Sequence, residues 1–341
     1  MKIRLVSYIY VVRMKRHKTM KQQWQDFLKT QLAQASSENA IFDLSHLGLL
    51  QLSGEDHLDF IQKQVTNDIN LLDGHNAQFT GYCSPKGRLL ALFLAFSHYD
   101  HLHLQLNGEL TETILKRLKM YVMRAKVTIE DMSESIIRIG VAGEKSNQVL
   151  ADIFEKIPVK PYQLVSLEKG AILRLGGDIP RYIVYSNIDN ISNIWQILGQ
   201  THTYVDKNYW ELLEIEAGIP EIFPTTQEAF VPQMINLDAF NAINYKKGCY
   251  TGQEIIARTH YLGKVKRRTL LAELVSEITP KIGDDVFGKV GTEAVGKIVR
   301  IAQVNANVFK MLVEARLENF ETGVIFWQDK PLQFKALPYS V

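Results

Sequence analysis

A proline-bearing stretch from about residue 218 to residue 247 most constrains how this chain can fold. It contains Pro220, Pro224 and Pro232. Proline fixes φ and removes a backbone N–H donor, so neither a long helix nor a central strand passes easily through such a stretch. The sequence therefore predicts a long irregular loop, and loops of this length inside compact proteins usually serve a function.

Helix and strand patterns alternate before this loop, which is typical of α+β layers. Strand-like apolar runs at 40–44, 47–52, 78–83, 88–96 and 101–106 precede helical patterns at about 111–123 and, later, 208–217. After the loop, alternating apolar residues with regular glycine turns predict a small C-terminal β-barrel. We therefore predict an α+β fold with modules at 21–135, 136–262 and 263–341, preceded by a basic leader at 1–20.

The leader carries Lys and Arg side chains but no acid. Its apolar run at 5–12 is too short to span a bilayer, and basic residues follow that run, unlike the order in a signal peptide. We expect a disordered or mispredicted leader on a cytoplasmic protein.

Cys249 lies in the segment 244–254, whose sequence is N-Y-K-K-G-C-Y-T-G-Q-E. Thr251 and Glu254 have the spacing of a capping box, which predicts that a helix starts here. The positive end of that helix, with Lys246 and Lys247, would favour a thiolate at Cys249. The alternative interpretation is a small buried apolar residue, the usual state of a lone cysteine.

Cys83 is the other cysteine, and the two form no C-x-x-C pair. This pattern is typical of a reducing compartment and argues against a zinc site or an iron–sulfur cluster held by this chain alone. The net charge of +2 over 341 residues does not by itself require a nucleic-acid or membrane partner.

The stretch K-K-G-C-Y-T-G-Q-E, with the basic run after it, resembles the signature of the YgfZ proteins. These are the folate-binding, tRNA-modification-linked branch of the glycine cleavage T-protein superfamily. Further matching segments follow in the same order along nearly the whole chain, at 52–56, 64–68, 83–88, 215–220, 230–233 and 337–340. The resemblance implies three modules around a central folate channel and a role in maintaining or repairing iron–sulfur enzymes, including those that thiolate tRNA.

The resemblance also implies site residues. Glu216, in the E-A-G motif, would accept the paired N–H donors of the folate pterin. Trp210 matches a tryptophan of the family's folate pocket, and Leu47 stands where that pocket has its other tryptophan. Cys249 would be the functional thiol, within a motif that includes Lys247, Gly248, Tyr250, Gly252, Gln253 and Glu254. The plainer interpretation is a solvated carboxylate and a core tryptophan.

Two other functions remain open. A folate-dependent aminomethyl transferase would need an acid in the hairpin at 87–92, where this sequence has none, and Glu214 stands where the T-protein motif has arginine. An RNA-binding module could use the basic run, which attracts anions: RNA phosphates, an acidic protein partner or the glutamate tail of folate. That run has one acid, Glu254, among Lys246, Lys247, Arg258, Lys264, Lys266, Arg267 and Arg268.

Overall fold

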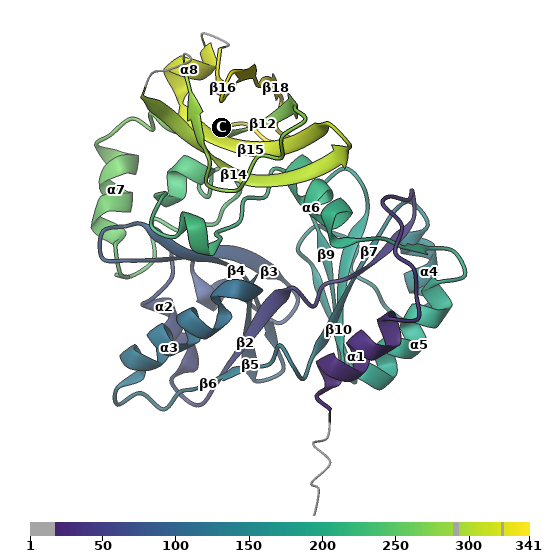
Figure 1. Cartoon of the computed structure of the whole chain (residues 1–341). Helices are drawn as coiled ribbons and strands as arrows, with labels where there is room; N and C mark the ends of the chain where they lie inside the picture. The colour runs from purple at the N-terminus through teal and green to yellow at the C-terminus, as the bar shows by residue number, and fades with distance from the viewer. Residues whose placement is uncertain (1–17, 289–292, 322–323) are drawn as a thin grey trace, which may run out of the picture.

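Three lobes make up the computed structural model, which describes residues 18–288, 293–321 and 324–341. Two lobes lie side by side and the C-terminal lobe sits across them (Figure 1). The predicted leader falls almost wholly outside the described residues. Every helix in the described stretches falls short of the length and apolarity needed to cross a bilayer.

The first lobe is an antiparallel sheet in the order β3-β4-β5-β2-β6. Helices α2 (His57–Gln62) and α3 (Thr111–Val122) lie on its outer side (Figure 1). Four strands confirm apolar runs predicted from the sequence: β2 (Leu47–Ser53), β3 (Ala77–Cys83), β4 (Leu89–His98) and β5 (His101–Asn107). The fifth strand of this sheet is β6 (Thr128–Asp131). Nearly every residue of β4 is buried, because its two faces pack against different layers.

The second lobe is a six-stranded sheet in the order β11-β1-β7-β10-β9-β8. Its strands are β1 (Ala40–Asp43), β7 (Ile137–Ala142), β8 (Leu164–Leu167), β9 (Gly170–Leu175), β10 (Arg181–Ser186) and β11 (Thr203–Tyr204). Helices α1 (Met20–Leu28), α4 (Ser146–Ile153) and α5 (Ile188–Leu198) flank it (Figure 1). Because β1 pairs with β7, the N-terminal residues through β1 join the sheet of the second segment rather than that of the first.

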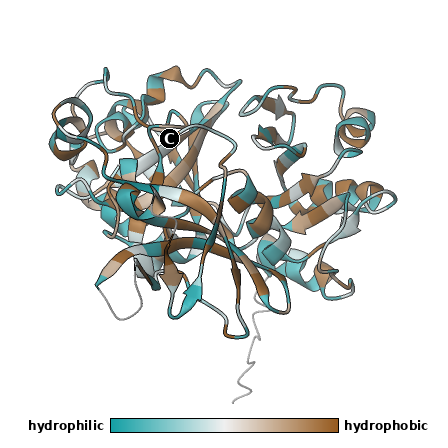
Figure 2. Cartoon of the chain, turned by 90° about the horizontal axis from the view of Figure 1, so that it is seen from above, coloured by the Kyte–Doolittle hydropathy of each residue, from teal (hydrophilic) through white to brown (hydrophobic). Residues whose placement is uncertain are grey.

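The third lobe is a seven-stranded sheet that curls into a nearly closed barrel, in the order β17-β16-β13-β14-β15-β12-β18. Its elements are β12 (Arg267–Val275), β13 (Asp285–Phe287), β14 (Ala294–Asn305), β15 (Val308–Arg316), α8 (Leu317–Glu321), β16 (Phe326–Trp327), β17 (Lys330–Pro331) and β18 (Gln333–Lys335). The predicted C-terminal barrel is thus confirmed. Seen from above, apolar residues gather along the strands while many loops are hydrophilic (Figure 2).

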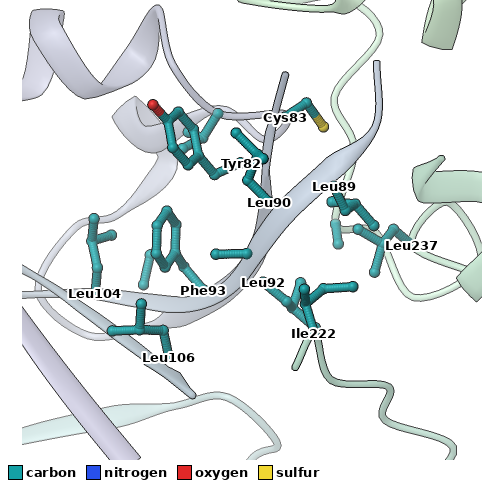
Figure 3. Packing of buried hydrophobic residues seen from close by; sticks show 14 of the residues in the cluster. Tyr82, Cys83, Leu89, Leu90, Leu92, Phe93, Leu104, Leu106, Ile222 and Leu237 are labelled. Atoms are coloured by element: carbon teal, nitrogen blue, oxygen red, sulfur yellow. The ribbon is translucent and has the colours of Figure 1, made fainter. Parts of the chain in front are cut away.

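The loop over 218–247 joins the lobes and, as predicted, contains only two short 3-10 turns, Pro224–Thr226 and Pro232–Ile235. Its apolar side chains pack on the first lobe: Ile222 lies beside Leu92, and Leu237 lies beside Leu89 (Figure 3). This packing holds the segment that follows, including the Cys249 motif, against the hairpin of β3 and β4.

Candidate functional site

Helix α6 (Lys207–Glu216) stands where the three lobes meet. It begins at Asp206, whose carboxylate accepts the backbone N–H groups of Asn208 and Tyr209. Leu212 and Ile215 belong to the core that contains the first sheet, whereas Trp210 and Leu213 belong to the core between the two sheets. The helix therefore fixes the walls of the space between the lobes.

A small space lies beside α6, and we call it the inner cavity. Its volume is about 40 Å³. That is room for about three water molecules, or for the edge of one aromatic ring. All three lobes contribute to its walls: Leu47, Phe79, Leu92, Leu94, Gln105, Leu106, Leu175, Ile183, Trp210, Glu214, Ile219, Pro220, Glu221 and Arg300.

Trp210 is a wall of the inner cavity and is only 2% exposed. Its ring packs edge-on against Phe42, with a centroid distance of 5.2 Å, and the Arg181 guanidinium carbon lies 5.7 Å from the ring centroid. Gly140 in β7 makes room for the indole, because a Cβ there would come within 2.6 Å of the ring. Leu47 lines the same cavity, so the structure brings Trp210 and Leu47 together.

Buried ion pairs beside the cavity join α6 to the barrel, through Arg300 of β14, and to the second sheet, through Arg181 of β10. Arg300 Nε donates to Glu211 Oε2 at 2.7 Å, and Arg181 Nη1 donates to Glu214 Oε1 at 2.9 Å. Arg300 sits at a register shift in β14, a bulge that re-aims its side chain. Burial opposes ionisation of Glu211, yet Arg300 and the neighbouring His46 hold the pKa of that carboxyl at about 2.

A second and larger space, the outer cavity, has a volume of about 550 Å³. Phe79 lines both cavities. Its ring meets Tyr162 and Phe240 edge-on at centroid distances of 5.7 and 5.5 Å, and Tyr245 stacks on His260 at 3.7 Å. Aromatic and amide side chains with one free lysine dominate the outer walls: Asn67, Gln78, Tyr162, Phe240, Asn241, Asn244, Tyr245, Lys246, His260 and Tyr261. Such a lining suits a flat ring with polar edges.

Glu216 does not line the inner cavity. Its carboxylate accepts a hydrogen bond from Lys310 Nζ at 2.5 Å, and it borders a separate small pocket with Gly177, Asp178 and Arg181. The structure therefore separates Glu216 from Trp210, although the two share a helix. The carboxylates that do line the cavity are Glu214 and Glu221.

Cys249 is exposed rather than buried as a small apolar residue, and helix α7 (Gln253–Tyr261) follows it. The predicted capping box is wrong. The N-cap is Gly252, with φ of 83° and no side-chain cap, rather than Thr251. A Cβ at Gly252 would also lie 2.5 Å from the Ser84 carbonyl oxygen, so glycine is required both by the left-handed backbone and by the close approach of the β3–β4 turn.

Lys247 does not lie in solvent beside the thiol. Its Nζ donates to the carbonyl oxygens of Gln62, Val65 and Asn67, each at 2.7 Å, and the residue is 9% exposed. Burial lowers the pKa of Lys247 to about 8, against the pull of Asp68. An ammonium with three N–H donors meets three carbonyl acceptors. Lys247 therefore fixes the motif to the first lobe, a role that the sequence did not indicate.

The other residues of the motif are partly buried in the core and partly exposed to solvent. Tyr250 is 8% exposed in the main core, with Lys247 Nζ at 5.2 Å from its ring centroid. Gln253 is half-buried at the helix start, while Gly248 and Glu254 are exposed. Segment 66–68 is also structural: Thr66 Oγ1 donates to the Ala242 carbonyl oxygen, and Asn67 Nδ2 donates to that of Asn241.

Fewer cations are exposed in the predicted basic patch than the sequence of the basic run contains. Arg267 pairs with Glu314, and Arg268 forms a two-pronged pair with Asp238 at 2.6 and 3.0 Å, so neither is free for an anion. With Lys247 buried, four exposed cations remain around α7: Lys246, Arg258, Lys264 and Lys266.

Glu221 and Arg300 were missed by sequence reasoning, although both leave a signal. Glu221 is a lone acid in the apolar run at 219–223, and Arg300 stands in β14 between apolar neighbours, Val299 and Ile301. A single charge within an apolar run is costly to bury, so it indicates a paired or ligand-facing group.

In the described part of the chain, no group of three or more His, Cys, Asp and Glu side chains is arranged to hold a metal ion.

The two thiols are expected to differ in reactivity. Burial raises the pKa of the Cys83 thiol, which lies 1% exposed in the core (Figure 3), whereas Cys249 is exposed. Because alkylation requires an accessible thiolate, iodoacetamide should modify Cys249 in the folded protein well before Cys83. Peptide mass analysis across a pH series measures both sites. Labelling of Cys83 ahead of Cys249 would contradict the structure of this region.

Sequence comparison with known proteins gives independent evidence on the family of this chain. The family described as the GCVT N-terminal domain matches residues 6–172. A protein of Colwellia psychrerythraea, described as tRNA-modifying protein YgfZ, is 35% identical over 253 residues, covering 74% of this chain and 76% of that protein. A protein of Yersinia pestis with the same description is 28% identical over 308 residues, covering 88% and 92%.

Comparison with solved structures concerns the fold alone. The glycine cleavage system aminomethyltransferase T from Bartonella henselae superposes with a TM-score of 0.71 at 13% identity. The match covers 89% of this chain and 87% of that chain, so the three-lobed arrangement is shared nearly end to end.

Proposed function

The chain belongs to the YgfZ family, and on that premise we propose that it is a cytoplasmic folate-binding protein that supports iron–sulfur enzymes and thereby cluster-dependent thiolation of tRNA. The observation that carries the proposal is the pair of cavities between the lobes, which share Phe79 as a wall. Nothing in the proposal requires covalent chemistry by this chain.

The residues present suit tetrahydrofolate or a one-carbon derivative. The inner cavity offers carboxylates to a pterin edge and apolar walls to its faces. The aromatic outer cavity suits the aminobenzoyl ring, and Lys246 gives the anionic glutamate tail a counter-charge. Bound folate would supply a one-carbon carrier; the chain's residues would bind it, orient it and exclude water.

The family resemblance implies that Glu216 accepts the N–H donors of the pterin, and this role stays a prediction. Its carboxylate would have to leave Lys310 to serve that role, because the two form an ion pair in this structure. Trp210 and Leu47 support the proposal more directly, since both are walls of the inner cavity.

Aminomethyl transfer is the weaker candidate. Leu92 and Leu94 of β4 line the inner cavity, and no acid stands among residues 87–92. An apolar side chain cannot transfer a proton. The four exposed cations around α7 suit a weak, salt-sensitive contact with RNA or an acidic protein surface, which is compatible with a role close to tRNA modification.

A complementation experiment tests the cellular role. In a strain that lacks its own copy of the protein, wild type should restore thiolated tRNA bases, and Cys249→Ala should not, because Cys249 is the exposed thiol of the motif. Cys83→Ala is the matched control and should restore them, since Cys83 is buried in the core. Full rescue by Cys249→Ala would remove the thiol from the proposal, and failure of wild type would remove the tRNA role.

A further inference from the structure

The first and second lobes, which lie side by side in Figure 1, leave a further cavity between their sheets, and we call it the seam pocket. Its volume is about 300 Å³, a size typical of small-molecule sites. In β4, Leu92 and Leu94 line the inner cavity, and Phe96, on the same face of the strand, lines the seam pocket. The Tyr185 hydroxyl, at the seam pocket, donates to Gln105 Oε1 at 2.9 Å, and Gln105 is a wall of the inner cavity. This hydrogen bond therefore stands between the two spaces.

His103 of β5 is a buried polar group in the wall of the seam pocket. It is 3% exposed, and its Nδ1 has no hydrogen-bond partner within the described residues. Burial lowers the pKa of His103 to about 3, helped by His98 and His101 and opposed by a backbone contact with His101, so the imidazole is neutral at pH 7. A neutral imidazole has one N–H donor and one acceptor nitrogen. Because buried polar groups are nearly always paired, a molecule in the seam pocket can supply the missing partner.

The wall around His103 is aromatic and carries no unopposed carboxylate or ammonium. Phe96 stacks on the His103 ring at a centroid distance of 5.1 Å, and the Tyr185 ring lies 4.9 Å from that of Phe96. Glu168 and Lys169, one acid and one base, also line the pocket, and both are exposed. Flat aromatic walls with a single polar contact favour a neutral ring over an ion.

We propose that the seam pocket binds a small neutral aromatic molecule whose ring carries a hydroxyl, and that the His103 imidazole is the hydrogen-bond partner of this hydroxyl. A hydroxyl both donates and accepts, so it can pair with the imidazole in either tautomer. The ring would lie in the apolar space beside Phe96 and Tyr185. In the described structure the seam pocket has lining residues different from those of the inner and outer cavities, so the proposal does not depend on folate binding.

The experiment is an NMR titration of the full chain, prepared with isotope-labelled histidine, at pH 7. The probes are 4-methylphenol, toluene as the same ring without the hydroxyl, and benzoate as an anion. Wild type should bind 4-methylphenol roughly 5- to 10-fold more tightly than toluene, the value of one neutral hydrogen bond. The His103 resonances should shift with 4-methylphenol. His103→Phe should lose this preference and still bind toluene, whereas His101→Phe, the control on the same strand, should keep it because His101 is outside the pocket lining.

A second variant locates the binding without touching the buried wall. Ser135 lines the seam pocket and is exposed, so Ser135→Trp should block the pocket and abolish binding of 4-methylphenol and toluene. Undiminished binding in Ser135→Trp would place the probes elsewhere and overturn the proposal. Equal affinity of wild type for 4-methylphenol and toluene, tighter binding of benzoate, or no binding of any probe would overturn it as well. Misfolding of His103→Phe does not obscure the result, because the comparison of the three probes is made on wild type.

Discussion

Replacing Lys247 with methionine is expected to lower the free energy of unfolding by about 3–5 kcal/mol, because each buried acceptor left without its donor costs about 1–3 kcal/mol. The three carbonyl oxygens that receive its N–H groups, at 2.7 Å each, would lose their donor while staying largely inaccessible to water. Methionine keeps the length and the apolar stem, so the loss reports on the ammonium. Urea unfolding at pH 7 measures it.

Lys246→Met is the matched control, because Lys246 is the neighbouring residue and is exposed. Its unfolding midpoint should stay at the wild-type value. Equal midpoints for the two variants would show that the carbonyl contacts do not hold the motif in place. The same pair separates two effects: loss of Lys247 should detach the Cys249 segment from residues 62–67, whereas loss of Lys246 should leave the segment attached and remove only the exposed charge proposed to face the folate tail.

Lys247 also shows where prediction from the sequence stops. Adjacent lysines before a glycine predict two solvated charges, and nothing local indicates that one of them meets three carbonyls more than 175 positions earlier in the chain. Arg267 and Arg268 repeat the point, since Glu314 and Asp238 neutralise them. Local patterns predict charge, but tertiary contacts decide which charges remain free.

Secondary structure was more predictable than the site. Strands such as β2, β4 and β5 arise from apolar runs with clear ends, and α6 from a helical pattern that stops before Gly218. The pairing of β1 with β7 was not predictable, because it joins residues about 100 apart. The start of α7 was misplaced because the T-x-x-E pattern suits a side-chain cap, whereas the backbone at Gly252 is left-handed.

The two carboxylates of the E-A-G region show why site assignment is harder still. Glu216 lies on α6 and Glu221 lies after the break at Pro220, and in sequence both are acids near a helix end. Only the packing of α6 between the lobes directs Glu216 toward Lys310 and places Glu221 at the inner cavity.

Arg300→Met should be about as destabilising as Lys247→Met, costing about 3–5 kcal/mol at pH 7, because it leaves a buried carboxylate without its main cation. The size of this expected loss of stability agrees with the lowered pKa of the Glu211 carboxyl. A value of about 2 in the folded chain, against an ordinary 4.5, corresponds to about 3 kcal/mol of native-state stabilisation when the carboxyl is ionised. Lys310→Met is the control: its partner Glu216 is partly exposed, so its removal should shift the unfolding midpoint little.

The pH dependence of the unfolding free energy shows whether Arg300→Met removes an ion pair or only the packing of the arginine side chain. The unfolded chain takes up the Glu211 proton near pH 4.5 and the folded wild type only near pH 2. The stabilisation from the pair is therefore complete above pH 4.5 and falls away as the pH drops toward 2. The difference in unfolding free energy between wild type and Arg300→Met should accordingly narrow between pH 7 and pH 3. A difference that stays constant across that range would mean that Arg300 contributes packing at the junction of α6 and the barrel, and that its charge does not hold the wall of the inner cavity.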